Sequence, residues 1–237
     1  MAATVVLVHG AWHGAWCWDK VVPLLDAAGV PSIAIELPGH GASTEPLADL
    51  DGDAATLHAV LADLDDAVVC GHSYGGAVIT VGAADMPSVR HLVYISAFPL
   101  APGESCMNAA AADVAPEAGA SELGSVLTFG DDGIVTLDTS RAAPLFFNDC
   151  TPEDVAWATE RLGAQAVAEL AGVAPVAAWQ TAPSTYVVCT DDRAVPPAFQ
   201  RAMATRCAHT IEWPTSHSPF LSRPDLVADL LSTLATN

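Results

Sequence analysis

The chain has 237 residues, 51% of them apolar, and its 28 acidic and 8 basic residues give a formal net charge of −20. This apolar content excludes an intrinsically disordered chain, and the length suits one domain around one hydrophobic core. Binding to nucleic acid or to an anionic membrane needs surface Lys and Arg, so the charge argues against both partners. We therefore expect a globular protein whose acidity serves solubility.

The N-terminal segment and the cysteines indicate a cytoplasmic protein. Residues 1–8 lack a basic region, and their apolar run is too short for a signal peptide. No stretch approaches the roughly 18 uninterrupted apolar residues of a membrane-spanning helix. The six cysteines are scattered and form no C-x-x-C pair, which favours reduced thiols over a disulfide framework or a zinc site. We expect no metal and no cofactor.

Short runs rich in Val and Ile alternate with segments of helical periodicity, which is typical of βαβ units around a parallel sheet. The predicted strands are residues 4–8, 32–36, 67–70, 91–96, 184–190 and 209–213. The predicted helices are residues 15–28, 54–64, 74–85, 197–204 and 224–234. The sequence therefore predicts an α/β protein with a six-stranded, mainly parallel, doubly wound sheet.

The interval 98–183 breaks this alternation because it contains no strong parallel-strand run. Thr151, Pro152 and two following acidic residues are typical of a helix start, and residues 155–170 continue that helix. We predict that 98–183 is a helical cap inserted into a core of residues 1–97 and 184–237. The cap would cover the carboxyl ends of the strands, where open α/β sheets bind ligands. The alternative is an ordinary stretch of crossover helices.

The segment Gly71-His72-Ser73-Tyr74-Gly75 matches the pattern G-x-S-x-G. It follows a predicted strand and precedes a predicted helix, which is the context of a strained turn that exposes a nucleophilic serine. The flanking glycines keep Cβ atoms out of the crowded bend. Ser73 is therefore the candidate nucleophile; the alternative is a glycine-softened turn with an inactive serine.

A serine hydroxyl needs a histidine base, and in this fold the chain order is serine, acid, histidine. That order leaves His209 and His217 as candidates. His217 lies in a polar loop between the last strand and the last helix, from which it could reach the sheet end. His209 begins the last strand and belongs to the opposite edge. The sequence therefore favours His217.

The acid that orients this histidine should follow the strand at 184–190, which leaves Asp191 and Asp192. Adjacent residues of an extended segment face opposite ways, so only one of them can contact His217. The spacing alone does not choose between them.

The negative charge that develops on an attacked carbonyl needs preorganised N–H donors. The turn after the first strand can supply one, and the residue after the nucleophile can supply the other. We assign these two donors to the backbone N–H groups of Ala11 and Tyr74. The alternative is that His9-Gly10 simply makes a tight turn.

The chain resembles small α/β-hydrolases that include plant methyl esterases of the salicylate-binding type, bacterial esterases and hydroxynitrile lyases. The similar stretches are residues 8–16, 37–41, 71–76, 147–154 and 189–192. The resemblance implies the α/β-hydrolase fold with its inserted cap. The family's acid stands in a pattern like C-T-x-D, so the resemblance, rather than the spacing, assigns the acid to Asp192.

Two positions separate this chain from the lyases of that family. The lyases carry a threonine after the first strand's histidine and a lysine after the catalytic histidine, where this chain has Gly10 and Ser218. A cation there suits departing cyanide, so its absence favours hydrolysis of carboxylic esters through an acyl-enzyme. The alternatives are hydroxynitrile lyase-type C–C cleavage and a small-molecule-binding receptor.

The expected partner is a small-molecule ester of apolar or aromatic character, and a homodimer is one option for the assembly. About three of the larger apolar side chains outside the predicted strands should line the ligand cavity. The candidates are Trp12, Phe98, Met107, Phe129, Phe146, Phe147, Trp157 and Trp179.

Overall fold

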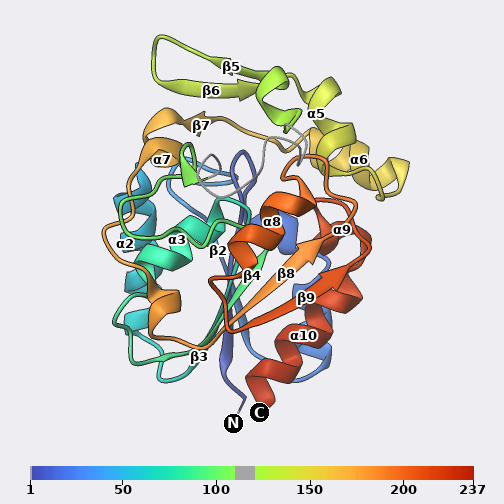
Figure 1. Ribbon diagram of the computed structural model, residues 1–237. Coiled ribbons are helices and arrows are strands. Elements are labelled where there is room, and N and C mark those ends of the chain that lie inside the picture. The colour runs from blue at the N-terminus through green and yellow to red at the C-terminus, as the bar shows by residue number, and fades with distance from the viewer. Residues whose placement is uncertain (1, 110–120) are drawn as a thin grey trace.

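The computed structural model describes residues 2–109 and 121–237. Its central sheet has six strands in the order β2-β1-β3-β4-β8-β9, and every neighbouring pair is parallel. The strands are β1 (Thr4–Val8), β2 (Ser32–Ile35), β3 (Ala67–His72), β4 (Val89–Ile95), β8 (Ser184–Cys189) and β9 (His209–Trp213). This sheet confirms the predicted α/β-hydrolase fold (Figure 1).

Helices cover both faces of this sheet. On one face α1 (Val22–Ala27) packs against α10 (Pro224–Thr236), and on the other α2 (Leu50–Ala62) packs against α3 (Gly75–Gly82). The helix α8 (Pro197–Ala204) packs against β8, and the short α9 (Pro219–Ser222) precedes α10. The longest described helices, α2 and α10, have 13 residues each, and no helix within the described ranges could cross a membrane.

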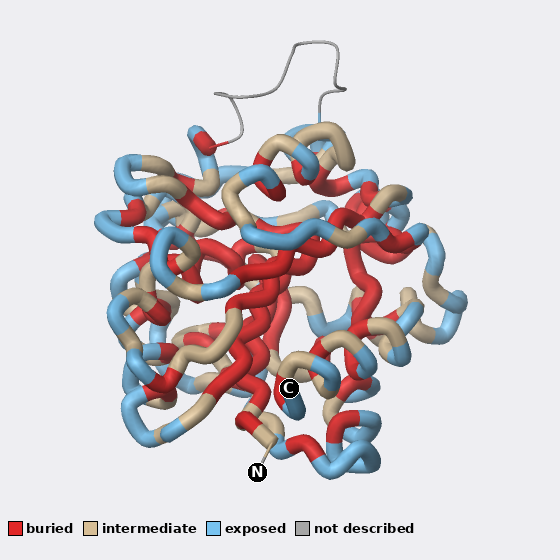
Figure 2. Tube along the Cα trace, turned by 60° about the horizontal axis from the view of Figure 1, so that its bottom comes forward, coloured by how far each residue is buried: buried red, intermediate tan, exposed pale blue. Residues whose placement is uncertain are grey.

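The sheet is buried because both of its faces are covered. Every residue of β3 and of β8 is buried, and in Figure 2 these strands form part of the continuous red interior. A strand that is buried on both faces consists of an uninterrupted apolar run instead of alternating apolar and polar residues. This is why the inner strands could be predicted from Val- and Ile-rich runs, whereas the edge strands β2 and β9 are only partly buried.

The predicted helix at 15–28 is wrong as a single element. A 3-10 turn, Ala15–Trp18, is followed by a break, and α1 begins only at Val22. Pro23 lies within the first two residues of α1. Proline has no N–H and its ring clashes with the carbonyl four residues earlier, so a helix can begin there but cannot run through it.

The inserted segment contains a small sheet as well as helices. Its helices are α5 (Thr139–Phe146), α6 (Pro152–Thr159) and α7 (Val167–Ala171), and 3-10 turns form at Leu123–Val126 and Ala178–Gln180. An antiparallel sheet joins β5 (Leu127–Phe129), β6 (Ile134–Leu137) and β7 (Gln165–Ala166). The sequence predicts a helical cap, and this three-stranded sheet corrects that prediction. Residues 110–120 of the predicted cap lie outside the described residues.

The predicted continuous helix at 155–170 is also wrong. Its start is confirmed, because Thr151 Oγ1 accepts a hydrogen bond from the N–H of Asp154 and caps α6. The helix ends at Thr159, after which the Gly163 N–H donates to the carbonyl of Trp12 and Gln165 pairs with β6. Contacts with distant parts of the chain therefore replace the helical hydrogen bonds.

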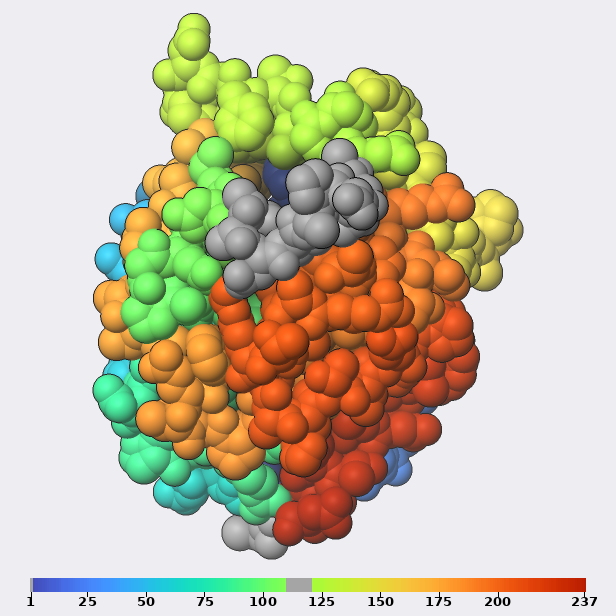
Figure 3. Space-filling view, in the orientation of Figure 1, coloured from blue at the N-terminus to red at the C-terminus, as the bar shows by residue number. Residues whose placement is uncertain are grey.

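The inserted segment lies across the carboxyl ends of the strands, at the top of Figures 1 and 3. It contacts the loops that follow three of them. The Gly163 N–H donates to Trp12 O after β1 at 2.7 Å, and Asn148 Nδ2 donates to Asp191 O after β8 at 3.1 Å. The Ser216 N–H after β9 donates to Asp149 Oδ2 at 2.9 Å.

Gly75, the first residue of α3, is the point where this helix touches β1. A Cβ atom there would lie 2.6 Å from the carbonyl oxygens of both Val8 and His9. Real Cβ atoms do not approach backbone oxygens so closely, and neither backbone group can rotate away. Only glycine therefore allows α3 to begin at this position.

We predict that Gly75→Ala destabilises the protein by about 2 kcal/mol, which is typical of an overpacked core. The sign is informative because Ala is normally the better helix former by about 1 kcal/mol. The measurement is the free energy of unfolding from urea denaturation. Gly124→Ala is the control, since a Cβ at this exposed residue would meet nothing within 4 Å. Equal stability of the two variants would contradict the close approach.

Candidate active site

Ser73 lies in the turn between β3 and α3 with a strained backbone. Its φ of 52° falls in the left-handed region, which residues other than glycine rarely adopt. Three backbone hydrogen bonds hold it: its N–H donates to Ile95 O at 3.2 Å, and its carbonyl accepts from the N–H groups of Gly76 at 2.9 Å and Phe98 at 3.2 Å. Ser73 is partly exposed although the residues on either side are buried, so its side chain is accessible. Such strain is typical of functional sites.

His217 and Asp192 form a buried hydrogen-bonded pair after the last two strands. The distance from His217 Nδ1 to Asp192 Oδ2 is 2.7 Å, and both side chains are almost completely buried. Since a carboxylate only accepts, Nδ1 carries the proton in this pair and donates it. The other ring nitrogen, Nε2, is then free to accept a proton in the neutral tautomer.

Asp192 accepts further hydrogen bonds that stabilise its charge in the interior. The backbone N–H groups of Ala194 and Val195 donate to Oδ1 at 2.8 and 2.9 Å, and Gln200 Nε2 donates to Oδ2 at 2.9 Å. The Ser96 hydroxyl also donates to Oδ2 and lies 3.1 Å from His217 Nδ1. A buried carboxylate needs such donors because desolvation of an unpaired charge is very costly.

The alternative acid and base lie elsewhere. Asp191 is exposed, and its carbonyl instead of its carboxylate is engaged, accepting from Asn148 Nδ2. His209 is the exposed first residue of β9, at the opposite end of the strand from the loop that carries His217. The structure thus brings Asp192 and His217 together and leaves Asp191 and His209 apart from them.

His72, the variable residue before Ser73, holds the backbone of His217. Burial lowers the pKa of His72 well below its usual value, so the ring is neutral. Its Nε2 lies 2.8 Å from His217 O and must be the donor, because a carbonyl only accepts. The two rings lie 4.6 Å apart between centroids. The nucleophile turn is in this way connected directly to the loop of His217, a role that sequence reasoning did not assign.

The predicted donors, the N–H groups of Ala11 and Tyr74, flank the same region. Within residues 2–109 and 121–237 the structure gives neither N–H an intramolecular acceptor. Gly10 lies against the nucleophile turn, since a Cβ at Gly10 would be 2.9 Å from Ser73 Cβ. The first-strand turn and the nucleophile turn are therefore in contact, with two free N–H groups at the junction.

Only some of the eight candidate apolar side chains approach His217. The Phe146 ring stacks on His217 at 5.5 Å between centroids, and the Trp12 ring stacks on Phe146 at 6.2 Å. Met107 and Phe129 are more than half exposed. Trp179 is anchored by a hydrogen bond from its indole N–H to Leu100 O at 2.8 Å. Phe146 and Trp12 are therefore the candidates that stacked rings connect to His217.

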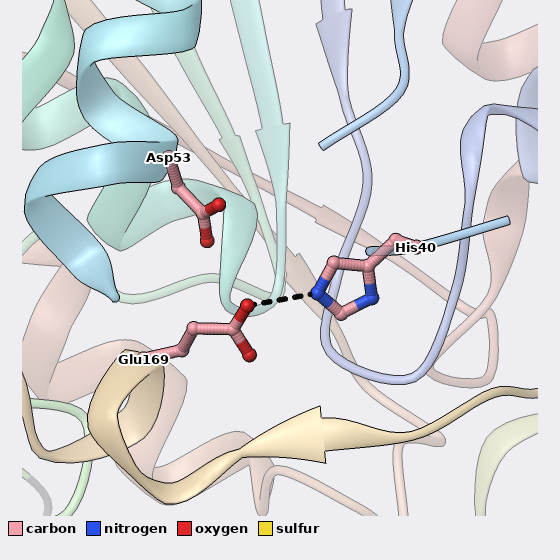
Figure 4. Close-up of side chains that lie close together, drawn as sticks. All are labelled: His40, Asp53 and Glu169. Atoms are coloured by element: carbon pink, nitrogen blue, oxygen red, sulfur yellow. Dashed lines mark hydrogen bonds and ion pairs between the residues drawn. The ribbon is translucent and has the colours of Figure 1, made fainter. Parts of the chain in front are cut away.

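A second cluster of polar side chains is buried where α2 and α7 meet (Figure 4). It consists of His40, Asp53 and Glu169. Each offers one possible metal-ligand atom, and these three atoms lie within 4.8 Å of one another, a spacing that could hold a metal ion. His40 Nε2 lies 3.1 Å from Glu169 Oε1. The Tyr74 hydroxyl donates to Asp53 Oδ2 at 2.6 Å. Sequence reasoning missed this cluster.

The fold is that of an α/β-hydrolase. The chain belongs to the alpha/beta hydrolase family, whose model matches residues 5–230.

Known relatives include esterases from bacteria and plants. A carbendazim hydrolyzing esterase from a Nocardioides species is 39% identical over 133 residues, covering 52% of this chain and 53% of that protein. Methylesterase 2 from Arabidopsis thaliana is 28% identical over 254 residues, covering 98% of this chain and 95% of that protein. The crystal structure of a pyrethroid hydrolase from Sphingobium faniae matches 100% of this chain and 98% of its own with a TM-score of 0.87 and 26% identity. The predicted resemblance to plant methyl esterases and bacterial esterases is confirmed.

Asp53 makes the stability of the fold depend on pH. Burial raises the pKa of Asp53 from 3.8 to about 7, so the folded state binds a proton that the unfolded state releases above pH 4. The stabilisation from this proton is complete below pH 4 and is lost as the pH rises from 4 to about 7.

We therefore predict that Asp53→Asn gains stability relative to the wild type as the pH rises through this window, by up to about 1.4 kcal/mol per pH unit. Urea denaturation at pH 5 and pH 7 measures the difference. Asp51→Asn, an exposed acid on the same helix, is the control and should give no such trend. A pH-independent difference between Asp53→Asn and the wild type would show that Asp53 titrates normally.

Proposed function

We propose that this protein is a carboxylesterase that uses Ser73 as nucleophile, His217 as base and Asp192 as the acid that orients it. The observation that carries the proposal is the buried hydrogen bond of 2.7 Å between His217 Nδ1 and Asp192 Oδ2. The loop of His217 is held by His72, the neighbour of a serine with a φ of 52°. Relatives named as esterases and methylesterases support the same reaction class.

In the proposed reaction, Ser73 Oγ attacks the ester carbonyl while His217 Nε2 takes its proton. The backbone N–H groups of Ala11 and Tyr74 hydrogen-bond the oxyanion, which suits two amides that have no acceptor in the described part of the chain. His217 then protonates the departing alcohol, and an acyl-enzyme remains on Ser73. Water, deprotonated by His217, releases the acid and restores the serine.

The substrate class that we propose is a small ester with an apolar or aromatic group. Phe146 stacks on His217, so a group bound next to the base would lie against an aromatic surface. An aromatic ring stabilises an apolar or aromatic ligand group through the apolar area it buries and through offset-stacked or edge-to-face contacts. The protein's net charge of −20 disfavours anionic esters.

We predict that Ser73→Ala lowers kcat on p-nitrophenyl esters by several orders of magnitude, up to about 10⁶-fold as in other serine hydrolases. Residual activity above about a hundredth of the wild-type rate would contradict the assignment of Ser73. Mandelonitrile is assayed in parallel, because cyanide release that depends on Ser73 would indicate the lyase instead. Saturable binding with turnover slower than about one per hour would indicate a receptor.

We predict that Asp192→Asn lowers kcat by about 10⁴-fold, because an amide can stabilise the wrong histidine tautomer. Asp191→Asn is the matched control, the same change at the neighbouring exposed acid, and should retain wild-type kcat within about twofold, as surface changes usually do. Both variants are compared with the same ester at saturating concentration. A loss of activity in Asp191→Asn instead would reassign the acid.

A further inference from the structure

Trp12, the residue after the proposed donor Ala11, is fixed by the inserted segment. Its φ of 61° lies in the left-handed region. The inserted segment makes three hydrogen bonds to it. The Trp12 N–H donates to Gln165 Oε1 at 2.9 Å, the indole N–H donates to Val135 O at 3.0 Å, and the Gly163 N–H donates to Trp12 O at 2.7 Å. An unfavourable backbone conformation persists only when its surroundings hold it in this way.

Gln165 is the link between this turn and the buried cluster. Its Oε1 accepts from Trp12, and its Nε2 donates to Glu169 Oε2. The orientation of the amide is therefore fixed, because the Trp12 N–H can only donate and the Glu169 carboxylate can only accept. Both side chains are completely buried. Neither an apolar nor an acidic residue at position 165 could satisfy both partners.

Both carboxylate oxygens of Glu169 have hydrogen-bond partners inside the protein. Its Oε2 accepts from Gln165 Nε2 and from the Ala166 N–H, and its Oε1 lies 3.1 Å from His40 Nε2. A cation bound among His40, Asp53 and Glu169 would have to displace the contact with His40. The existing partners therefore favour a hydrogen-bond network over a metal site.

The second proposed donor is connected to the same cluster. The Tyr74 hydroxyl donates to Asp53 Oδ2 at 2.6 Å, and Asp53 lies with His40 and Glu169 in the group shown in Figure 4. Both residues that supply the proposed oxyanion-hole N–H groups are thus connected by hydrogen bonds to one buried cluster. Ala11 reaches it through Trp12 and Gln165, and Tyr74 reaches it through its own side chain.

We propose that Gln165 and Glu169 are positioning residues that aim the Ala11 N–H at the oxyanion; this inference rests on the proposed esterase function. Neither side chain touches the reacting atoms. Gln165 holds the N–H of Trp12, Glu169 holds the amide of Gln165, and through Trp12 this pair restrains the turn that carries the Ala11 N–H. The oxyanion forms only in the transition state, so a misdirected N–H donor weakens transition-state stabilisation and not substrate binding. We therefore expect kcat to fall while KM is retained.

Two single variants at Gln165 and one exchange variant test this proposal. The value of kcat is expressed per active site, as titrated with a fluorophosphonate, so that misfolded protein is excluded. Gln165→Leu and Gln165→Glu should each lower kcat by at least about tenfold, against the roughly 10²- to 10³-fold cost of removing a donor outright. KM should stay within about threefold of the wild type, because ground-state binding is retained. Gln180→Leu, at an exposed glutamine of the same inserted segment, is the control and should match the wild type.

The decisive variant exchanges the two groups, combining Gln165→Glu with Glu169→Gln. A carboxylate at 165 can accept from both the Trp12 N–H and an amide at 169, so only the bond from the Ala166 N–H is sacrificed. We expect kcat per site to return to within about threefold of the wild type. Inhibition by an aryl trifluoromethyl ketone, whose adduct with Ser73 carries an oxyanion, should weaken and recover by the same factors.

Wild-type kcat per site in Gln165→Glu would overturn the proposal, as would an exchange variant no better than the single variants. Activity of the wild type that is abolished by EDTA and restored by Zn²⁺ would overturn it in favour of a cation site. Wild-type ester hydrolysis that does not depend on Ser73 would instead overturn the proposed function, and the Ser73→Ala variant in the same assay separates that result from the others.

Discussion

The structure depends on how closely three backbone segments meet at the carboxyl end of the sheet. A Cβ on Gly75 would lie 2.6 Å from the carbonyl oxygens of β1, and one on Gly71 would lie 2.5 Å from Gly75 O. Without side chains at these positions, the turn after β1 and the turn after β3 are in direct contact. This contact allows Ser73 to keep its left-handed backbone and places Gly10 beside it. The polar pairs around the site are arranged around this junction.

The inner strands β1, β3, β4 and β8 could be predicted because burial on both faces leaves a plain apolar signal, which the partly exposed edge strands β2 and β9 carry less clearly. β1 and β9 have the predicted bounds, and the other four strands differ by one or two residues at their ends. The choice between Asp191 and Asp192 needed the family resemblance, since both residues fit the spacing. The structure adds the physical difference, because Asp192 is buried among five donors while Asp191 is exposed.

The parts that could not be predicted are contacts between residues far apart in the sequence. Gln165 lies 153 positions from Trp12, and Glu169 lies 129 positions from His40. No local sequence pattern predicts such pairs, so the sequence indicates only that Gln165 and Glu169 belong to a helix. The hairpin of β5 and β6 did have a local signal, since Asp132-Gly133 is typical of a hairpin turn and Gly133 has a φ of 79°. Its short strands were hidden by the absence of a long apolar run.

The hydrogen bonds between the inserted segment and the strand-end loops also bear on how this family diversifies. Gly163, Asn148 and Asp149 hold the loops after β1, β8 and β9, respectively, so the segment is part of the scaffold on which the site is built. An insertion transplanted from a relative would therefore have to bring matching partners for all three loops. Chimeras that keep those anchor points and Val135 of β6, whose carbonyl holds the Trp12 indole, and vary only the exposed turn at residues 130–133, are the route that leaves this scaffold intact.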